Sequence, residues 1–193
     1  MQITYSNKTA KTQAAIFLDR DGVINHDYEY VHKAENFVFI NDVFDCCKQF
    51  IKQGYIIVII TNQSGIARGY YSEEDFNLLN QWMLEQFKLN HIDITATYFC
   101  PHHSIKGVGN YKIDCECRKP KPGMIQQAAQ EHHINLAQSI LIGDNLSDIK
   151  AGKAAGIGKN FLVQTGKEKI QDNLNLADGI FKSLSEIVYN KAI

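Results

Sequence analysis

Short apolar runs recur along the chain, and most of them end in polar residues. The run at 55–60 is apolar at every position, which is typical of a strand whose two faces are both covered by helices. The apolar runs at 15–18 and 139–143 have the same character and end at Asp19 and Asp144. Further strands are expected at 95–99, at 161–163 and around 180–181.

Helical spacing separates these runs. Apolar residues recur every three or four positions at 43–51 and 76–87, and the residues from Ser72 to Asp75 are typical of a capped helix start. Further helices are expected from about 124, at 147–155 and at 184–189. Strands that alternate with helices predict a mainly parallel sheet between two helical layers, a Rossmann-like three-layer α/β/α fold.

The domain organisation follows from the distribution of these elements. Residues 1–13 are mostly polar and contain no apolar signal core, so we expect a flexible N-terminal arm followed by a single domain at 14–193. The intervals from Asp21 to Thr61 and from Thr61 to Lys119 leave no room for a large cap domain. Short loops must therefore select any substrate.

Composition narrows the class of protein. The net charge of −1 predicts no binding to nucleic acid or to an anionic membrane surface, and no apolar run is long enough to cross a bilayer. Five cysteines, two of them adjacent at Cys46 and Cys47, are not typical of a disulfide framework and fit a reducing compartment. We expect a monomeric protein of the cytoplasm.

Polar residues at three predicted strand ends carry the candidate chemistry. Asp19 and Asp21 end the first strand, Thr61 follows the second and Asp144 follows another. The carboxyl ends of parallel strands face the ligand crevice, so these side chains are expected to meet there. Neighbouring carboxylates repel one another and are costly to desolvate, and a bound metal ion would relieve both effects.

Four short motifs occur in a fixed order along the chain. They are Asp-Arg-Asp-Gly-Val at 19–23, Thr61, the Lys119-Pro120 step, and Gly-Asp-Asn-Leu-Ser-Asp at 143–148. Over about residues 14–166, this order resembles the phosphatases of the haloacid dehalogenase superfamily. More narrowly, the chain is similar to the D-glycero-D-manno-heptose 1,7-bisphosphate phosphatases and the related histidinol-phosphate phosphatases.

The resemblance implies a mechanism. Asp19 would attack phosphorus and become an aspartyl phosphate, while Asp21 would protonate the leaving oxygen and later activate water. Thr61 and Lys119 would bind the phosphoryl oxygens. Mg²⁺ would be held by the carboxylates of Asp19 and Asp144 and by the backbone carbonyl of Asp21, and would offset the repulsion between Asp19 and the phosphate.

One position departs from the relatives. They often carry Lys or Arg directly after the Asp that ends the later strand, where this chain has Asn145. A cation near the substrate is therefore either missing or supplied elsewhere, for example by Lys121 or Arg68. Asp148, one helical turn beyond Asp144, is expected to support the metal ligands rather than to bind the metal, or else to be a charge favoured at a helix N-terminus.

A cysteine-rich loop at 100–117 precedes Arg118 and Lys119. Three thiolates and one imidazole form a typical set of ligands for a closed structural zinc site, and the spacing matches the relatives. The ligands would be Cys100, His102, Cys115 and Cys117. His103 is the alternative to His102. Four protein ligands leave no open position, so zinc would stabilise the loop rather than take part in the reaction.

Polar residues of the surrounding loops are candidates for binding the substrate. Arg118 is the strongest of them, because a guanidinium binds phosphate or sugar oxygens in a fork. The others are Asp27, Tyr30, Asn62, Gln63, Ser64 and Arg68. The alternative is that these residues are ordinary solvated loop residues that do not bind substrate.

The resemblance implies hydrolysis of the phosphate at carbon 7 of heptose 1,7-bisphosphate, in the synthesis of ADP-heptose for the lipopolysaccharide core. The first alternative is a histidinol-phosphate phosphatase with the same machinery. A second, from another class, is a non-catalytic zinc-stabilised interaction domain. The complete set of Asp19, Asp21 and Asp144 argues against that second alternative.

Overall fold

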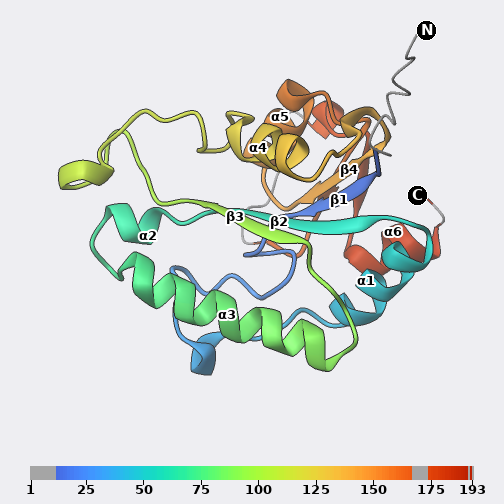
Figure 1. Ribbon diagram of the computed structural model, residues 1–193, viewed down its shortest axis with the longest axis horizontal. Coiled ribbons are helices and arrows are strands. Elements are labelled where there is room, and N and C mark those ends of the chain that lie inside the picture. Colours follow the sequence, from blue (N-terminus) through green and yellow to red (C-terminus); the bar gives the residue numbers. More distant parts are fainter. Residues whose placement is uncertain (1–11, 167–173, 191, 193) are drawn as a thin grey trace, which may run out of the picture.

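A computed structural model describes residues 12–166, 174–190 and 192. These residues contain a parallel six-stranded sheet in the order β3-β2-β1-β4-β5-β6 (Figure 1). The strands are β1 (Ala15–Leu18), β2 (Ile56–Asn62), β3 (Ala96–Cys100), β4 (Ile140–Gly143), β5 (Lys159–Val163) and β6 (Gly179–Phe181). Phe17 of β1 lies opposite Val58 of β2 and Leu141 of β4, so β1 is flanked on both sides.

Helices cover both faces of the sheet, with α1, α3 and α6 on one face and α4 and α5 on the other (Figure 1). Their bounds are α1 (Val43–Lys52), α2 (Ser64–Ala67), α3 (Glu73–Leu89), α4 (Gly123–Glu131), α5 (Leu146–Ala155) and α6 (Leu184–Tyr189). The predicted three-layer fold is confirmed. The short helix α2 was not predicted, because one turn is too short to show a hydrophobic period.

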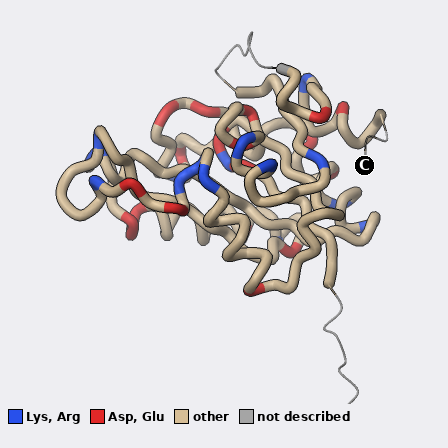
Figure 2. The backbone as a smooth tube through the Cα atoms, turned by 90° about the horizontal axis from the view of Figure 1, so that it is seen from above, with Lys and Arg blue, Asp and Glu red and all other residues tan. Residues whose placement is uncertain are grey.

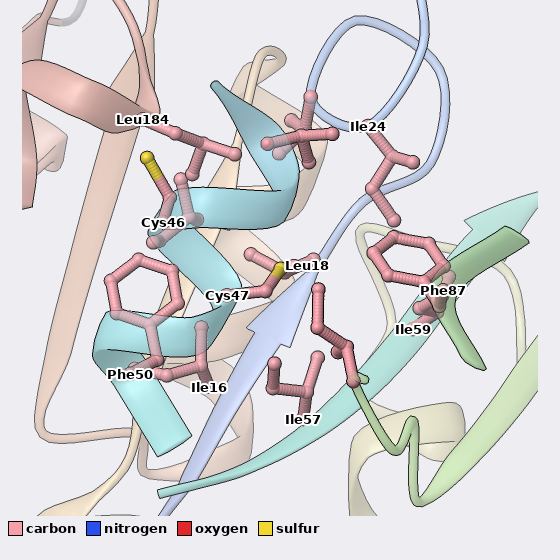
Figure 3. Packing of buried hydrophobic residues seen from close by; sticks show 14 of the residues in the cluster. Ile16, Leu18, Ile24, Cys46, Cys47, Phe50, Ile57, Ile59, Phe87 and Leu184 are labelled. Carbon is pink, nitrogen blue, oxygen red and sulfur yellow. The ribbon is translucent and has the colours of Figure 1, made fainter. Parts of the chain in front are cut away.

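Alternate residues of β1 enter two separate cores. Ile16 and Leu18 point toward α1, where they meet Cys47 and Phe50 (Figure 3). Phe17, between them, packs against the opposite layer formed by α4 and α5. This alternation follows from the two-residue period of a strand, and burial on both faces explains why the run is apolar throughout.

The start of α3 follows the predicted capping pattern. The Ser72 hydroxyl accepts a hydrogen bond from the amide of Asp75, and the Asp75 carboxylate accepts one from the amide of Ser72. This reciprocal pair satisfies two amides that the helix itself leaves without partners. The helix therefore begins where its sequence indicates.

Most of the predicted N-terminal arm, residues 1–11, lies outside the described residues. Gln13, also assigned to the arm, pairs with Ile134 as an isolated bridge at the margin of the sheet.

No described helix has the length and apolar character needed to cross a membrane. Acidic and basic positions are intermixed over the described part of the chain (Figure 2).

The segments before and after β2 build no separate lid domain within the described residues. Between β1 and β2 they form loops and α1, and between β2 and Lys119 they form α2, α3, β3 and the cysteine-rich loop. Leu79 and Met83 of α3 belong to the same core as α1. The predicted absence of a large cap domain agrees with this arrangement.

Candidate active site

Three carboxylates meet at the carboxyl ends of β1 and β4. Asp19 directly follows β1, Asp144 directly follows β4, and Asp148 lies in the first turn of α5. One oxygen from each carboxylate lies within 4.8 Å of the others. The sheet order causes this meeting, because β1 and β4 are hydrogen-bonded neighbours. The cluster offers carboxylate oxygens at the spacing that a shared divalent cation requires.

The buried ammonium of Lys119 joins two of these carboxylates. Its Nζ lies 2.9 Å from Asp19 Oδ1 and 2.6 Å from Asp148 Oδ1, and it donates a hydrogen bond of 3.0 Å to the Ile60 carbonyl. Burial lowers the pKa of Lys119, but Asp148 and Asp19 more than offset this effect and raise it overall. Lys119 therefore stays cationic beside Asp19.

The charge of the cluster is only partly balanced. Burial is the largest cause that raises the pKa of Asp19 to about 7; Lys119 opposes the rise and Asp148 adds to it. Burial, followed by repulsion from Asp19 and Asp148, raises the pKa of Asp144 to about 9. An ion bound between Asp19 and Asp144 would remove this repulsion, so the donor set fits Mg²⁺.

Two glycines enclose the Asp144 carboxylate. Gly22 and Gly166 both approach it so closely that a Cβ atom on either would collide with Asp144 Oδ2. Gly22 also has a φ of +83°, a conformation that glycine adopts at little cost. The hydroxyl of Thr165 donates a hydrogen bond to the Gly22 carbonyl. These contacts hold the segments after β1 and β5 against Asp144.

A residue that sequence reasoning missed, Arg20, holds the carboxylate of Asp21. Its guanidinium donates to Asp21 Oδ1 at 2.9 Å and to Oδ2 at 3.2 Å, and it donates to the Val31 carbonyl at 2.8 Å. Arg20 is 1% exposed and lies over the rings of Phe37 and Phe76. An arginine between two acidic residues gives no sequence signal for burial, because its cover comes from distant segments.

The amide of Gln63 connects the predicted phosphate-binding residue to the predicted acid. Gln63 Nε2 donates to Thr61 Oγ1 at 2.8 Å and to Asp21 Oδ2 at 3.2 Å. Its Oε1 accepts a hydrogen bond of 2.5 Å from the Tyr71 hydroxyl. Gln63 was predicted to bind substrate, but protein groups engage both ends of its side chain.

Asn62 is likewise engaged by the protein. Its Oδ1 accepts from the Lys119 amide and its Nδ2 donates to the Lys119 carbonyl, both at 3.1 Å. This pair of bonds fixes the backbone of Lys119 against the end of β2. The side chain predicted to bind substrate therefore holds the segment that carries the cation.

A cavity of about 400 Å³ opens beside these groups. Of the predicted site residues, it is lined by Asp21, Asp27, Tyr30, Asn62, Gln63 and Ser64. Its walls are polar, as expected of a site for a hydrophilic ligand. A larger cavity of about 510 Å³ lies at the amino ends of the strands, near Ala14 and Ile140, and contains none of the predicted site residues.

Two predicted cations lie on the side of the cysteine-rich loop. The guanidinium of Arg68 lies 5.7 Å from the centre of the Tyr30 ring, and Arg118 Nη1 donates to the His102 carbonyl at 3.1 Å. Burial, and then Arg118 and Arg68, lower the pKa of His103. Both arginines therefore influence the charge of His103, and Arg68 also contacts Tyr30, which lines the cavity.

The departure at Asn145 has a structural explanation. Asn145 caps α5: its Oδ1 accepts from the Ser147 amide at 2.9 Å, and its own amide donates to Asp148 Oδ2 at 3.0 Å. Lys121, one suggested replacement for a cation at this point, is paired with Asp114 at 2.8 Å and with Glu116 at 3.2 Å. Of the two suggested replacements, Arg68 is the one in contact with Tyr30 at the cavity.

The four predicted zinc ligands come together. The sulfur atoms of Cys100, Cys115 and Cys117 lie 3.1–3.4 Å apart, and His102 Nδ1 lies 3.5 Å from the Cys117 sulfur. A zinc ion bonded to sulfur at about 2.3 Å would separate the sulfurs by about 3.8 Å, so small outward shifts would admit it. Hydrogen bonding with Cys100 is the largest cause that lowers the pKa of Cys117, to about 5.

The alternative ligand, His103, has a different role in the loop. Its Nδ1 accepts hydrogen bonds from the amides of Ile105 at 3.3 Å and Lys106 at 3.2 Å. These bonds close a turn outside the sulfur cluster. The geometry therefore places His102, rather than His103, with the three cysteines.

Comparison with known proteins identifies the family. The curated D-glycero-β-D-manno-heptose-1,7-bisphosphate 7-phosphatase of Haemophilus influenzae is 48% identical over 173 residues, which are 90% of this chain and 94% of that protein. This chain belongs to that family. The enzyme of the same name from Escherichia coli K12 is 43% identical over 92% of this chain and 93% of its own length. A family model described as HAD-hydrolase-like, for haloacid dehalogenase-like, matches residues 116–187.

A solved structure supports the fold and the choice of metal. It is described as D,D-heptose 1,7-bisphosphate phosphatase from B. bronchiseptica complexed with magnesium and phosphate. It is 26% identical, has a TM-score of 0.77, and the match covers 93% of this chain and 98% of that one. The predicted membership of the haloacid dehalogenase superfamily is confirmed. Phosphatases of this superfamily use Mg²⁺.

Proposed function

We propose that this protein is a magnesium-dependent phosphatase that removes the C7 phosphate of D-glycero-β-D-manno-heptose 1,7-bisphosphate. The reaction would supply the heptose precursor of the lipopolysaccharide core. The observation that carries the proposal is the meeting of Asp19, Asp144 and Lys119 at the strand ends, in a chain 43–48% identical to phosphatases of that name. The protein would work as a monomer in the cytoplasm, where its free cysteines would stay reduced.

Asp19 is the proposed nucleophile and Asp21 the proposed acid. A carboxylate oxygen of Asp19 bonds to phosphorus as the bond from phosphorus to the C7 oxygen breaks, and Asp21 gives that oxygen a proton. Asp21 then takes a proton from water, whose oxygen bonds to phosphorus and releases Asp19. The guanidinium of Arg20, which also donates to the Val31 carbonyl, holds Asp21 in place during both steps.

The remaining groups of the proposed site stabilise charge. Bound Mg²⁺ would neutralise part of the phosphoryl charge, held by the carboxylates of Asp19 and Asp144 and by the Asp21 carbonyl. Lys119 supplies a fixed cation, and the Thr61 hydroxyl supplies a donor. Asp148 would keep Lys119 at the site through their 2.6 Å ion pair.

The loop at 100–117 is proposed to hold a structural zinc ion through Cys100, His102, Cys115 and Cys117. Arg118 follows the last ligand and donates to the carbonyl of His102. Zinc would thus fix Arg118 near the cavity, where it would bind the second phosphate of the substrate, with Arg68 beside Tyr30 as a further cation. Asp27 and Ser64 line the cavity and would bind sugar hydroxyls.

Phosphate release from a small set of substrates tests the proposal. The set contains both anomers of heptose 1,7-bisphosphate and histidinol phosphate, each with Mg²⁺, and the Asp19→Asn variant serves as the blank. We expect kcat/KM to be at least about tenfold higher for the β-anomer than for histidinol phosphate. A preference for histidinol phosphate would replace the proposed substrate, and inactivity on every ester would support the interaction domain.

A further inference from the structure

The side-chain amide of Gln63 lies between the two halves of the proposed catalytic machinery. Gln63 is 2% exposed. Its nitrogen donates to Thr61 Oγ1 at 2.8 Å and to Asp21 Oδ2 at 3.2 Å, while its oxygen accepts from the Tyr71 hydroxyl at 2.5 Å. One amide group thus contacts the donor to the phosphoryl oxygens and the proton donor to the leaving group.

The direction of this amide matters because its two ends have opposite hydrogen-bonding character. An amide oxygen only accepts and an amide nitrogen only donates, although the two orientations occupy almost the same volume. The Tyr71 hydroxyl resolves the choice, since its proton requires an acceptor. Burial is the largest cause that raises the pKa of Tyr71, so the hydroxyl keeps that proton.

The observed direction suits both catalytic partners. Thr61 Oγ1 accepts from Gln63, so its own proton remains free to be donated to a phosphoryl oxygen. In the reversed orientation, the Gln63 carbonyl would compete for that proton and would also face the Asp21 carboxylate. The reversed amide would therefore weaken the Thr61 donor and repel Asp21 in the carboxylate form that takes a proton from water.

Packing holds Tyr71 in place independently of its hydroxyl. Its ring lies so close to Gly65 that a Cβ atom there would collide with it. The imidazole of His32 stacks on the ring with a centroid distance of 4.8 Å and an interplanar angle of 6°. Tyr71 itself is 7% exposed. Removal of the hydroxyl alone should leave these contacts intact.

We propose that Tyr71 is a positioning residue, which orients the amide of Gln63 and, through it, Asp21 and Thr61. Its hydroxyl is engaged by Gln63, although its side chain also lines the cavity. This inference deepens the proposed function and rests on it for the roles of Asp21 and Thr61.

A double-mutant cycle tests the inference. Tyr71→Phe, Gln63→Leu and the double variant are assayed with Mg²⁺ on the heptose bisphosphate and on para-nitrophenyl phosphate. We expect Tyr71→Phe to lower kcat about five- to twentyfold and to change KM less than about twofold. In the Gln63→Leu background the same change should lower kcat less than about twofold, because the amide that it orients is absent. Tyr70→Phe, which removes a neighbouring hydroxyl, should retain the wild-type rate.

Other outcomes would overturn the inference. They are a Tyr71→Phe variant with a kcat within twofold of wild type, or an equal loss of kcat in both backgrounds. Inactivity of wild type on the heptose bisphosphate would refute the proposed substrate instead. An activity-independent readout covers that case: the side-chain amide protons of Gln63, assigned by their loss in Gln63→Leu, should exchange with water at least about tenfold faster in Tyr71→Phe. Unchanged exchange would contradict the proposed orientation.

Discussion

Lys119 Nζ lies 2.9 Å from Asp19 Oδ1, which joins a loop residue after β3 to the residue that directly follows β1. The bond places a permanent cation beside the proposed nucleophile before any substrate arrives. It also compensates one of several negative charges that burial makes costly. The proposed catalytic role of Lys119 and its role in stability therefore coincide in one side chain.

Replacement of this cation should affect both roles. Lys119→Ala leaves Asp19 and Asp148 buried without their shared partner, so we expect a loss of about 3–5 kcal/mol in the free energy of unfolding. Phosphate release should fall at least about hundredfold. Urea unfolding and steady-state kinetics measure the two effects. Lys48→Ala, which breaks an exposed pair with Asp45, is the control and should change neither quantity appreciably.

Magnesium binding should depend on pH. Because the pKa of Asp19 is raised to about 7 and that of Asp144 to about 9, both carboxyls retain protons near neutral pH, and the metal must displace them. We expect affinity for Mg²⁺ to rise at least about tenfold from about pH 6.5 to 8.5, with release of protons. Calorimetry in two buffers of different ionisation enthalpy measures both. A dissociation constant independent of pH would contradict this.

The same groups predict how stability changes with pH. Both folded-state pKa values exceed the ordinary value of 3.8, and from about pH 4 to 7 these two carboxyls outweigh the lowered pKa of Cys117. Over that range the metal-free folded protein therefore holds more protons than the unfolded chain. Its free energy of unfolding should therefore fall as pH rises through this range. Saturating Mg²⁺ should reverse the trend, because it binds the charged form. Thermal unfolding with and without Mg²⁺ tests this.

Much of the site could be predicted because it depends on strand ends. Asp19, Thr61 and Asp144 were expected to meet from the parallel sheet alone, and the sheet order places them at neighbouring strands. The spacing of cysteines around His102 likewise indicated the ligand cluster. For the strand ends, a local pattern and one rule of fold geometry were sufficient, whereas the choice of the cysteines and His102 also rested on the resemblance to the relatives.

The missed features depend on contacts between distant segments. Arg20 is buried by the rings of Phe37 and Phe76, which no local pattern connects to it. Asn62 and Gln63 were assigned to the substrate because polar residues after a strand often face a ligand. Both line the cavity, but their side chains also bond to Lys119, Thr61, Asp21 and Tyr71. Only the folded chain supplies those partners.

The two-point hydrogen bonding of the Arg20 guanidinium to Asp21 should contribute more to kcat than its positive charge does. Arg20→Lys keeps a cation but loses the two-point contact with Asp21, so we expect kcat to fall about tenfold to hundredfold. In an Asp21→Asn background, the same substitution should lower kcat further by less than about twofold. Stopped-flow measurement of the first turnover would separate the formation of the proposed aspartyl phosphate from its hydrolysis. Undiminished activity of Arg20→Lys would show that orientation of Asp21 does not limit the rate.

Loss of zinc should act on substrate binding more than on the chemical step. Cys117→Ser is expected to reduce bound zinc from about one ion per chain to nearly none. It should raise KM for the bisphosphate about tenfold or more, since Arg118 loses its support. Elemental analysis measures the zinc content, and steady-state kinetics with Mg²⁺ present measure KM. Cys46→Ala, which alters a buried cysteine of α1, should retain zinc; full activity of a zinc-free protein would refute the coupling.

The close approach of Gly22 and Gly166 to Asp144 divides the cleft into a rigid part and an adaptable one. A side chain at either glycine would collide with Asp144, so the proposed ion site leaves little room for remodelling. Asp27, Tyr30 and Ser64 line the cavity, and we expect that they can be exchanged without disturbing the proposed ion site. A designer who wished to redirect this scaffold to another phosphate ester would therefore vary these loops and leave the glycine-enclosed carboxylate untouched.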